Sequence, residues 1–200
     1  YQLRITDKNG QFIKELLPVD PKSKVLHGLG QNFYVYDGKL NVFPHFSNTI
    51  FSITPDSTTQ RYHLYLGDYH FADDEIFQKK EYNSQAIMSE IMNNSYVRLM
   101  APYETDEHLL VKYYVKRQVL LGIYNKKKHT AINLDPEMVI DSLHLGTFPV
   151  PIGFNHNEFI GQLTLDIQQK NRIMIPELQK LMADYSEDSN PILIFYSLRS

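Results

Sequence analysis

A hairpin pattern that occurs three times along the chain constrains its fold more than any other feature. Each copy is an apolar run with alternating side chains, then a polar turn and a second run, over residues 2–17, 49–66 and 118–134. The turns between the runs are residues 7–10, 55–58 and 125–128. A repeated antiparallel unit is typical of a β-propeller or a β-sandwich. Because one fold serves many functions, the pattern predicts an architecture and not a reaction.

The composition indicates a globular protein without a nucleic-acid partner. The 200 residues are 42% apolar and 12% aromatic, which is enough to build a packed core. A net charge of −3 gives no electrostatic attraction for a nucleic-acid backbone. The basic run from Lys126 to Lys128 lies between two strand-like segments and is predicted to be a solvated turn. The chain has no cysteine, so disulfides and thiolate metal sites are excluded.

The sequence shows neither a membrane span nor a signal segment. No stretch approaches the roughly 20 continuous apolar residues that a spanning helix needs. The first residues carry neither a basic start nor an apolar signal core, and Tyr1 opens directly into a strand-like run. We therefore expect the chain to be a processed or truncated piece, in which a missing signal is uninformative.

Two groups of consecutive strand-like segments each have the size of one propeller blade. The first group comprises residues 33–36, 40–43, 49–53 and the run after the turn at 55–58. The second group comprises residues 96–101, 108–115, 119–124 and 130–134. Four consecutive strands over about 35 residues match one blade of a propeller.

Two short helices are predicted as insertions that accompany the sheets. Ser84 is suited to cap the first helix, whose apolar face is formed by Ile87, Met88, Ile91 and Met92. Pro176 is suited to the first turn of the second helix, in which apolar residues again recur at helical spacing.

The C-terminal third has fewer regular signals. Residues 142–145 and 158–163 are strand-like. Residues 192–196 form a nearly continuous apolar run after Asn190 and Pro191. A short apolar run without polar alternation is typical of a strand that is covered on both faces. We therefore expect residues 192–196 to be a buried strand that closes the domain.

Several of these turns and the last strand resemble a known family. The segments are Asp7-Lys8-Asn9-Gly10, Tyr36-Asp37-Gly38-Lys39-Leu40 and the terminal Asn190-Pro191-Ile192-Leu193-Ile194-Phe195-Tyr196. They are similar to the six-bladed β-propeller proteins of Bacteroides and its relatives, and the similarity spans most of the chain. The resemblance implies an exported protein, often a lipoprotein, in the periplasm or anchored at the outer membrane. It implies no established activity.

The length of the chain corresponds to part of such a propeller. Six blades of about 45 residues need well over 250 residues, whereas this chain has room for about three. We therefore predict an all-β fold, a β-propeller present as a partial ring of four-stranded antiparallel sheets with short inserted helices. Residues 1–200 are then a single propeller domain or the C-terminal part of one. Exposed faces of unpartnered blades would lead to self-association.

Polar clusters give one hypothesis for a metal site. Residues 68–75 place four carboxylates around His70, although a solvated loop before a helix explains them equally well. His45 and His156 lie in predicted loops, where propellers collect their ligands. A metal centre built by His45, His70 and His156 from several blades is therefore an alternative, although the histidine spacing of helical zinc sites is missing. Two strand histidines are interpreted as ordinary sheet residues, namely His63 and His144.

Aromatic side chains form the second class of candidate site. The chain has 14 Tyr and 11 Phe, and exposed aromatic rings stack on sugars and peptide chains. Most of them fall at period two within strands and are expected in the core. The tyrosines near turns, together with the loop histidines, are the predicted ligand-binding residues: Tyr34, Tyr36, His45, Tyr69, Tyr103 and His156.

The sequence favours a non-enzymatic function. It contains no nucleophile elbow, no phosphate-binding glycine loop and no dinucleotide fingerprint. We therefore predict a binding or scaffold module of the bacterial cell envelope, without a cofactor, that recognises a protein, peptide or glycan through loops on one propeller face. The alternative is a metal-dependent hydrolase or lyase with its site in the propeller channel, and a third possibility is packing against another subunit. Three or four polar side chains that meet at one axis would favour the enzyme.

Overall fold

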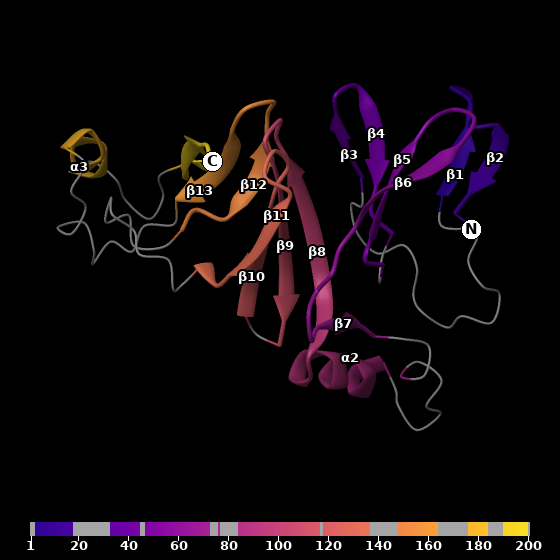
Figure 1. Cartoon of the computed structure of the whole chain (residues 1–200), viewed down its shortest axis with the longest axis horizontal. Coiled ribbons are helices and arrows are strands. Elements are labelled where there is room, and N and C mark those ends of the chain that lie inside the picture. Colours follow the sequence, from indigo (N-terminus) through magenta and orange to yellow (C-terminus); the bar gives the residue numbers. More distant parts are fainter. Residues whose placement is uncertain are drawn as a thin grey trace. The chain divides into compact units, whose positions relative to one another are not determined.

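The computed structural model shows a chain built mainly of β-strands (Figure 1). It describes residues 3–17, 33–44, 47–72, 76, 84–116, 118–136, 148–163, 176–183 and 190–199. The predicted strand at 142–145 lies outside the described residues, as do His45 and His144. Within the described residues the strands form antiparallel sheets, with one short parallel addition. The predicted all-β class is therefore confirmed.

The first sheet is a hairpin of β1 (Leu3–Thr6) and β2 (Phe12–Leu16). Its turn is held by the Asp7 carboxylate, which accepts hydrogen bonds from the backbone N–H groups of Asn9 and Gln11, each at 2.8 Å. Gly10 has a φ of 82°, a left-handed conformation that glycine adopts without steric cost. An aspartate that bonds to the backbone just after it is a common stabiliser of such turns. The predicted hairpin is therefore confirmed.

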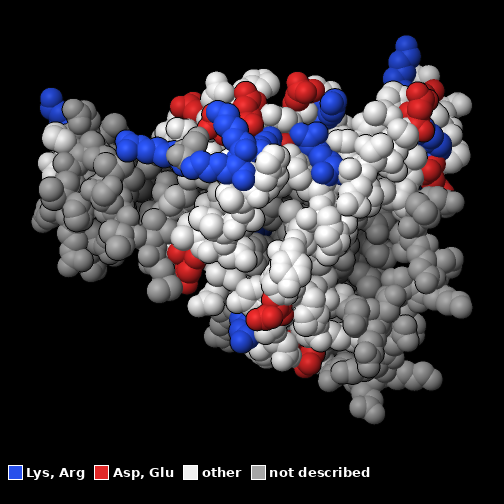
Figure 2. Space-filling view, in the orientation of Figure 1, with Lys and Arg blue, Asp and Glu red and all other residues white. Residues whose placement is uncertain are grey.

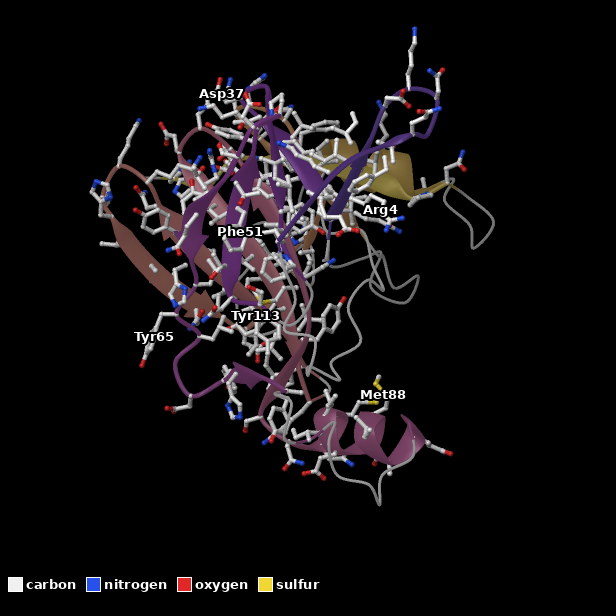
Figure 3. The ribbon with its side chains drawn as sticks, turned by 90° about the vertical axis from the view of Figure 1, so that its right-hand side faces the viewer. Arg4, Asp37, Phe51, Tyr65, Met88 and Tyr113 are labelled. Atoms are coloured by element: carbon white, nitrogen blue, oxygen red, sulfur yellow. The ribbon has the colours of Figure 1, made fainter. Side chains whose placement is uncertain are left out.

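A four-stranded sheet follows, in which neighbouring strands are also consecutive in the sequence. Its strands are β3 (Phe33–Tyr36), β4 (Lys39–Val42), β5 (Thr49–Ile53) and β6 (Thr58–His63). Between β3 and β4, Asp37 has a φ of 51° and Gly38 a φ of 66°, as a two-residue type I′ turn requires. Asp37 marks this hairpin tip in Figure 3. The first predicted group of strands is therefore confirmed.

The largest sheet has the strand order β11-β10-β9-β8-β7. Its long strands are β8 (Tyr96–Glu104), β9 (His108–Val115), β10 (Gln118–Asn125) and β11 (Thr130–Leu134), which confirms the second predicted group. At the other edge, β7 (His70–Phe71) pairs parallel with the start of β8. The sequence pattern does not predict β7, because two residues are too short to show any periodicity.

A three-stranded sheet consists of β12 (Pro151–Phe154), β13 (Phe159–Leu163) and β14 (Ile192–Tyr196), in that order. The predicted strand at 192–196 is confirmed, but the prediction that it is buried is wrong. Leu193 and Phe195 are 50% and 55% exposed. Within the described residues β14 pairs only with β13, so it is an edge strand with one face covered.

Two helices accompany the sheets, α2 (Ser84–Asn93) and α3 (Pro176–Ala183), and both begin at the predicted residue. In α2, Ile91 is 1% exposed and packs in a core cluster together with Ile87. Met88 is 47% exposed and projects from the helix (Figure 3), so its predicted burial is wrong. Ile87 and Ile91 are one turn apart and lie on the buried face of the helix, whereas Met88 is rotated by about 100° around the helix axis. Among the described residues, no helix is long and apolar enough to cross a membrane.

The chain divides into two compact units, residues 1–101 with 113–118 and residues 102–112 with 119–200. The division passes through β8 and β9, which contribute residues to both units. In the first unit, a buried cluster is formed by Ala72, Ile76 and Ile91. In the second unit, Leu110, Leu121 and Phe159 come together from β9, β10 and β13. The core of the second unit therefore joins its two sheets.

Candidate functional site

Three hairpin tips of the second unit meet through backbone hydrogen bonds (Figure 1). They are the turns that connect β8 to β9, β10 to β11 and β12 to β13. The N–H of Asp106 in the first turn donates to the carbonyl of His156 in the third, at 2.8 Å. The N–H of Lys126 in the second turn donates to the carbonyl of Glu107 in the first, at 2.9 Å. Turns that are distant in the sequence are thus held side by side, as in binding surfaces made of loops on a sheet scaffold.

A buried ion pair adjoins these tips. Glu104 is 0% exposed, and the Nζ of Lys126 lies 2.7 Å from its Oε1. The same Nζ donates a hydrogen bond to the carbonyl of Thr105 at 2.6 Å. Removing a carboxylate and an ammonium group from water is costly, so a buried pair contributes little net stability even when it is well formed. Its effect here is to attach the turn after β10 to the end of β8.

Thr105 and His108 close the first turn from within. The N–H of Thr105 donates to the carbonyl of His108 at 2.8 Å, and the N–H of His108 donates to the Oγ1 of Thr105 at 3.1 Å. Thr105 is 3% exposed and His108 is 4% exposed. Buried polar groups need partners inside the protein, and Thr105 and His108 supply some of these partners to each other within the turn. Its conformation therefore does not depend on contact with solvent.

The amide of Asn125 determines the tautomer of His108. Its Oδ1 accepts hydrogen bonds from the backbone N–H groups of Lys127 and Lys128, at 3.0 and 2.8 Å. Its Nδ2 therefore faces the Nε2 of His108, at 3.1 Å, and donates to it. An accepting Nε2 carries no proton, so the imidazole is neutral and is protonated on Nδ1.

The surroundings of His108 also favour the neutral form of its imidazole. Burial lowers the pKa of His108 below its ordinary value. The carboxylate of Glu107 opposes this shift of the pKa, while the charges of Lys126 and Lys127 reinforce it. We name the buried group the turn cluster, and it consists of Glu104, Thr105, His108, Asn125 and Lys126.

The surface above the turn cluster is polar and carries both signs of charge. Figure 2 shows basic and acidic side chains next to one another on the upper part of the view, where Figure 1 draws these tips. Lys127 forms an ion pair with Glu107 there. We name the exposed residues of the three turns the turn platform, and they are Asp106, Lys127, Lys128, His129, Asn155, His156 and Asn157. The platform presents hydrogen-bond donors and acceptors on turns that the turn cluster holds in position.

The turn cluster is arranged for positioning and not for proton transfer. Glu104 is paired with Lys126, and the Nε2 of His108 accepts from Asn125. A general acid or base must come within hydrogen-bond distance of a substrate proton, and Glu104 and His108 are 0% and 4% exposed. The chemistry available to a ligand is therefore that of the platform side chains.

The structure distributes the predicted ligand-binding residues over both units. His156 belongs to the turn platform, where it is exposed. Tyr103, in β8, is half-buried against the core around Leu110, and the Nζ of Lys112 lies 5.7 Å from its ring centroid. Burial lowers the pKa of Lys112. Tyr103 is therefore a partly covered neighbour of the core and not a projecting aromatic.

The other three predicted tyrosines lie in the first unit. Tyr34 is 8% exposed, so the prediction that it lies on the surface is wrong, because the alternation of β3 turns it toward the covered face. Tyr36 is partly buried, with the guanidinium of Arg61 5.2 Å from its ring centroid. Tyr69 is also partly buried, and its ring centroid lies 6.4 Å from that of Tyr113.

Tyr65 is an exposed aromatic residue that the sequence pattern did not single out. It is 87% exposed and projects from the segment after β6 (Figure 3). The sequence pattern predicts that the second run of this hairpin continues to residue 66, but β6 ends at His63. Tyr113 is the opposite case, since it is 1% exposed and its hydroxyl has no hydrogen-bond partner in the described part of the chain. Burial and the nearby Tyr69 raise the pKa of Tyr113 to about 12.

The described residues do not form the metal site that was considered as an alternative. His70 lies in β7, where its ring centroid is 4.8 Å from that of Tyr96, and His156 lies on the turn platform. Among the described residues, no three His, Asp or Glu side chains form a group that could hold a metal ion. His63 lies in β6, in the sheet as predicted, and its Nδ1 is 3.2 Å from the Oγ1 of Thr49 across the sheet. Outside the described residues lie His45, Asp73, Asp74 and Glu75.

The basic run and the turn before β9 show what the sequence pattern missed. Lys127 and Lys128 are exposed as predicted, but the Lys126 side chain is only 19% exposed because it pairs with Glu104. The sequence pattern leaves Glu104 between the predicted strands at 96–101 and 108–115, and His108 begins the second of these strands. No local signal distinguishes them, because their partners come from a different hairpin.

Comparisons with known proteins give matches to a family model and to a solved structure. A family model described as a domain of unknown function, DUF4934, matches residues 1–197. The crystal structure of a "Putative exported protein" from Bacteroides fragilis is similar, with a TM-score of 0.81 and 17% sequence identity. The similarity covers 98% of this chain and 57% of that one, so the chain spans little more than half of that protein. No curated protein matches the chain.

Proposed function

The chain belongs to the DUF4934 family, and we propose that it is a non-enzymatic binding or scaffold module of the bacterial cell envelope. Its ligand is a protein, a peptide or a glycan, held at the turn platform. Export to the periplasm, or to an anchored position at the outer membrane, is supported by the similar structure from Bacteroides fragilis, whose description names an exported protein.

The sheets are proposed to be blades of a six-bladed β-propeller, of which residues 1–200 form a partial ring. The four-stranded sheet β3-β4-β5-β6 and the run β8 to β11 each contain four antiparallel strands in sequence order, which is the composition of a blade. The third blade is represented by the sheet of β12, β13 and β14. In this arrangement, residues 1–200 are one propeller domain or part of one, and the turn platform lies at one end of its blades.

The observation that carries the binding proposal is the burial of the Glu104–Lys126 ion pair next to exposed turns. A hairpin does not need a buried ion pair in order to form, since the turn between β1 and β2 is held by hydrogen bonds to the Asp7 carboxylate and between backbone groups. Apolar side chains of similar size usually stabilise a protein at least as well as a buried ion pair. We therefore attribute the buried ion pair to its effect on the turns, which it holds in a fixed position. Loops that are ordered before binding lose less entropy when a ligand arrives.

The side chains of the platform indicate a ligand rich in hydrogen-bonding groups. Asp106 supplies a carboxylate, His156 an imidazole and Asn157 an amide, all on exposed turn positions. Such groups are suited to the hydroxyls of a glycan or to the backbone of a peptide, because each offers a donor, an acceptor or both.

The proposal is tested with the labelled full chain on a glycan array and on an immobilised peptide library. For the strongest binder found, we expect His156→Ala combined with Asn157→Ala to weaken binding about thirtyfold, since two hydrogen bonds of about 1 kcal/mol each are lost. The matched control is Asp56→Ala in the turn between β5 and β6, which should leave the affinity unchanged. Equal losses in the platform variant and the control, or no binding to either array, would contradict the proposal. A stoichiometric, chelator-sensitive metal in native mass spectra would favour the alternative of a metal-dependent hydrolase or lyase.

A further inference from the structure

The edge of β14 is a second candidate interaction surface. Among the described residues, β14 forms one edge of its sheet, and it pairs with β13 through five consecutive residue pairs without a bulge. An edge strand presents backbone N–H and C=O groups to any other strand, and proteins usually protect such edges with charges, proline or bulges. The segment Ile192–Tyr196 contains no charged residue and no proline. The usual protection is therefore missing from β14.

Several other edge strands in the described residues carry such protection. Lys14 is in β2, Arg61 is in β6, and Pro151 begins β12, whose register with β13 is also irregular. The edge strand β11 is uncharged as well, but it exposes one large apolar side chain, Ile132. The edge strand β3 is also uncharged and exposes two, Phe33 at 50% and Val35 at 61%, but it has only four residues. β14 exposes Leu193 at 50% and Phe195 at 55% on one face, and its pattern extends over five residues.

The side-chain pattern of β14 is symmetric about Ile194. Leu193 and Phe195 are exposed, whereas Ile192, Ile194 and Tyr196 are partly buried on the other face. If two copies of this strand pair antiparallel with Ile194 at a two-fold axis, Leu193 of one copy lies opposite Phe195 of the other. The exposed side chains of both copies then lie on one face of the joined sheet, and the partly buried side chains of both copies lie on the other face. The strand is thus complementary to itself, as an isologous interface requires.

We propose that two copies of this chain pair through β14, antiparallel and centred on Ile194, so that their three-stranded sheets join into one continuous sheet. A second copy is the occupant because the pattern matches itself and because no like charges oppose each other across the new pairing. Five residue pairs bury less than the roughly 800 Å² per partner of a standard interface. The dimer is therefore weak and depends on protein concentration.

The proposed register predicts opposite outcomes for two double variants. When Leu193→Lys is combined with Phe195→Glu, each introduced ammonium group faces an introduced carboxylate of the other copy, so the dimer persists and becomes sensitive to salt. When Leu193→Lys is combined with Phe195→Lys, ammonium groups face each other and the dimer is lost. Both positions are exposed, so both variants should fold, which circular dichroism melting checks. The matched control is Ile132→Lys in β11, which should leave the dimer unchanged.

Sedimentation velocity over a series of concentrations, from low micromolar to several hundred micromolar, measures the association. We expect the wild-type chain to approach twice the monomer mass, and the Lys/Glu variant to associate about tenfold more tightly than the Lys/Lys variant. A wild-type chain that remains monomeric throughout the series would overturn the proposal. Equal association of the two double variants would overturn it too, because that result excludes the register. Loss of the dimer in Ile132→Lys would assign the contact to β11 instead.

Discussion

Asn125 connects the two kinds of interaction in the turn cluster. Its carbonyl oxygen accepts from two backbone N–H groups, and its nitrogen donates to His108. The next residue, Lys126, neutralises Glu104. In a water-poor interior, a polar network is stabilising only when each member has a partner, so the loss of one member leaves the others unsatisfied. Single substitutions in this group should therefore cost more than substitutions on the platform above it.

Replacing Lys126 by Met is expected to destabilise the protein by about 3 kcal/mol, because it leaves the Glu104 carboxylate buried without its counter-charge. The matched control is Lys127→Met, whose partner Glu107 is accessible to solvent, and its cost should be below about 1 kcal/mol. Urea denaturation of both variants and of the wild type gives the two free energies of unfolding. Equal losses of unfolding free energy in the two variants would show that the buried ion pair stabilises the protein no more than the exposed pair does.

Stability is expected to decrease in mild acid because of His108. Burial lowers its pKa in the native protein, so the unfolded chain, whose histidines titrate near the ordinary value of 6.5, binds the proton more readily. The contribution of His108 is therefore complete above the unfolded-state pKa, falls as the pH decreases below it, and is lost once the pH has passed through the lower native pKa. Protonation also removes the hydrogen bond from Asn125.

The free energy of unfolding should accordingly fall between about pH 7.5 and about pH 5.5, and the fall should be smaller in His108→Gln. Urea denaturation at the two pH values measures this difference. An unchanged pH dependence in the variant would mean that another group causes it.

At the level of strands and turns, local chemistry made most elements predictable from the sequence. The turn at Asp37 and Gly38 and the hairpin around Asp7 depend on residues within four positions of one another. The exposure of β14 was predicted wrongly, because an apolar strand is buried only if something packs on both of its faces. The burial of Tyr34 was missed for a related reason, since its distance from a turn says nothing about which face of β3 is covered.

Two glycines in the same sheet give a prediction for packing between elements. A Cβ at Gly161 in β13 would lie 2.8 Å from the Cβ of Pro149 and 3.0 Å from its carbonyl oxygen. A Cβ at Gly153 in β12 would lie 3.7 Å from the Cδ1 of Ile160, an ordinary contact. Gly161→Ala is therefore expected to cost about 1–3 kcal/mol, and the control Gly153→Ala much less. Thermal unfolding of both variants checks this, and equal melting temperatures would contradict it.

At the scale of the whole molecule, the all-β class could be predicted but the candidate site could be predicted only in part. His156 was identified because it lies in a loop between strands, and loops carry most ligand contacts. Glu104 and His108 were not identified, because the turn cluster combines residues from two hairpins and its backbone contacts involve a third. Periodicity and turn chemistry act over a few residues, whereas a buried ion pair is created by the tertiary fold.

Amide hydrogen exchange measured by NMR shows whether the three turns form one rigid platform. The informative N–H groups are those of Thr105, Asp106 and Lys126, each of which donates to a carbonyl within or between the turns. We expect these three amides to be protected to the same extent and to lose their protection together in Lys126→Met. Exchange at the rate of an unstructured peptide, or loss of protection at only one of the three amides, would contradict a rigid platform.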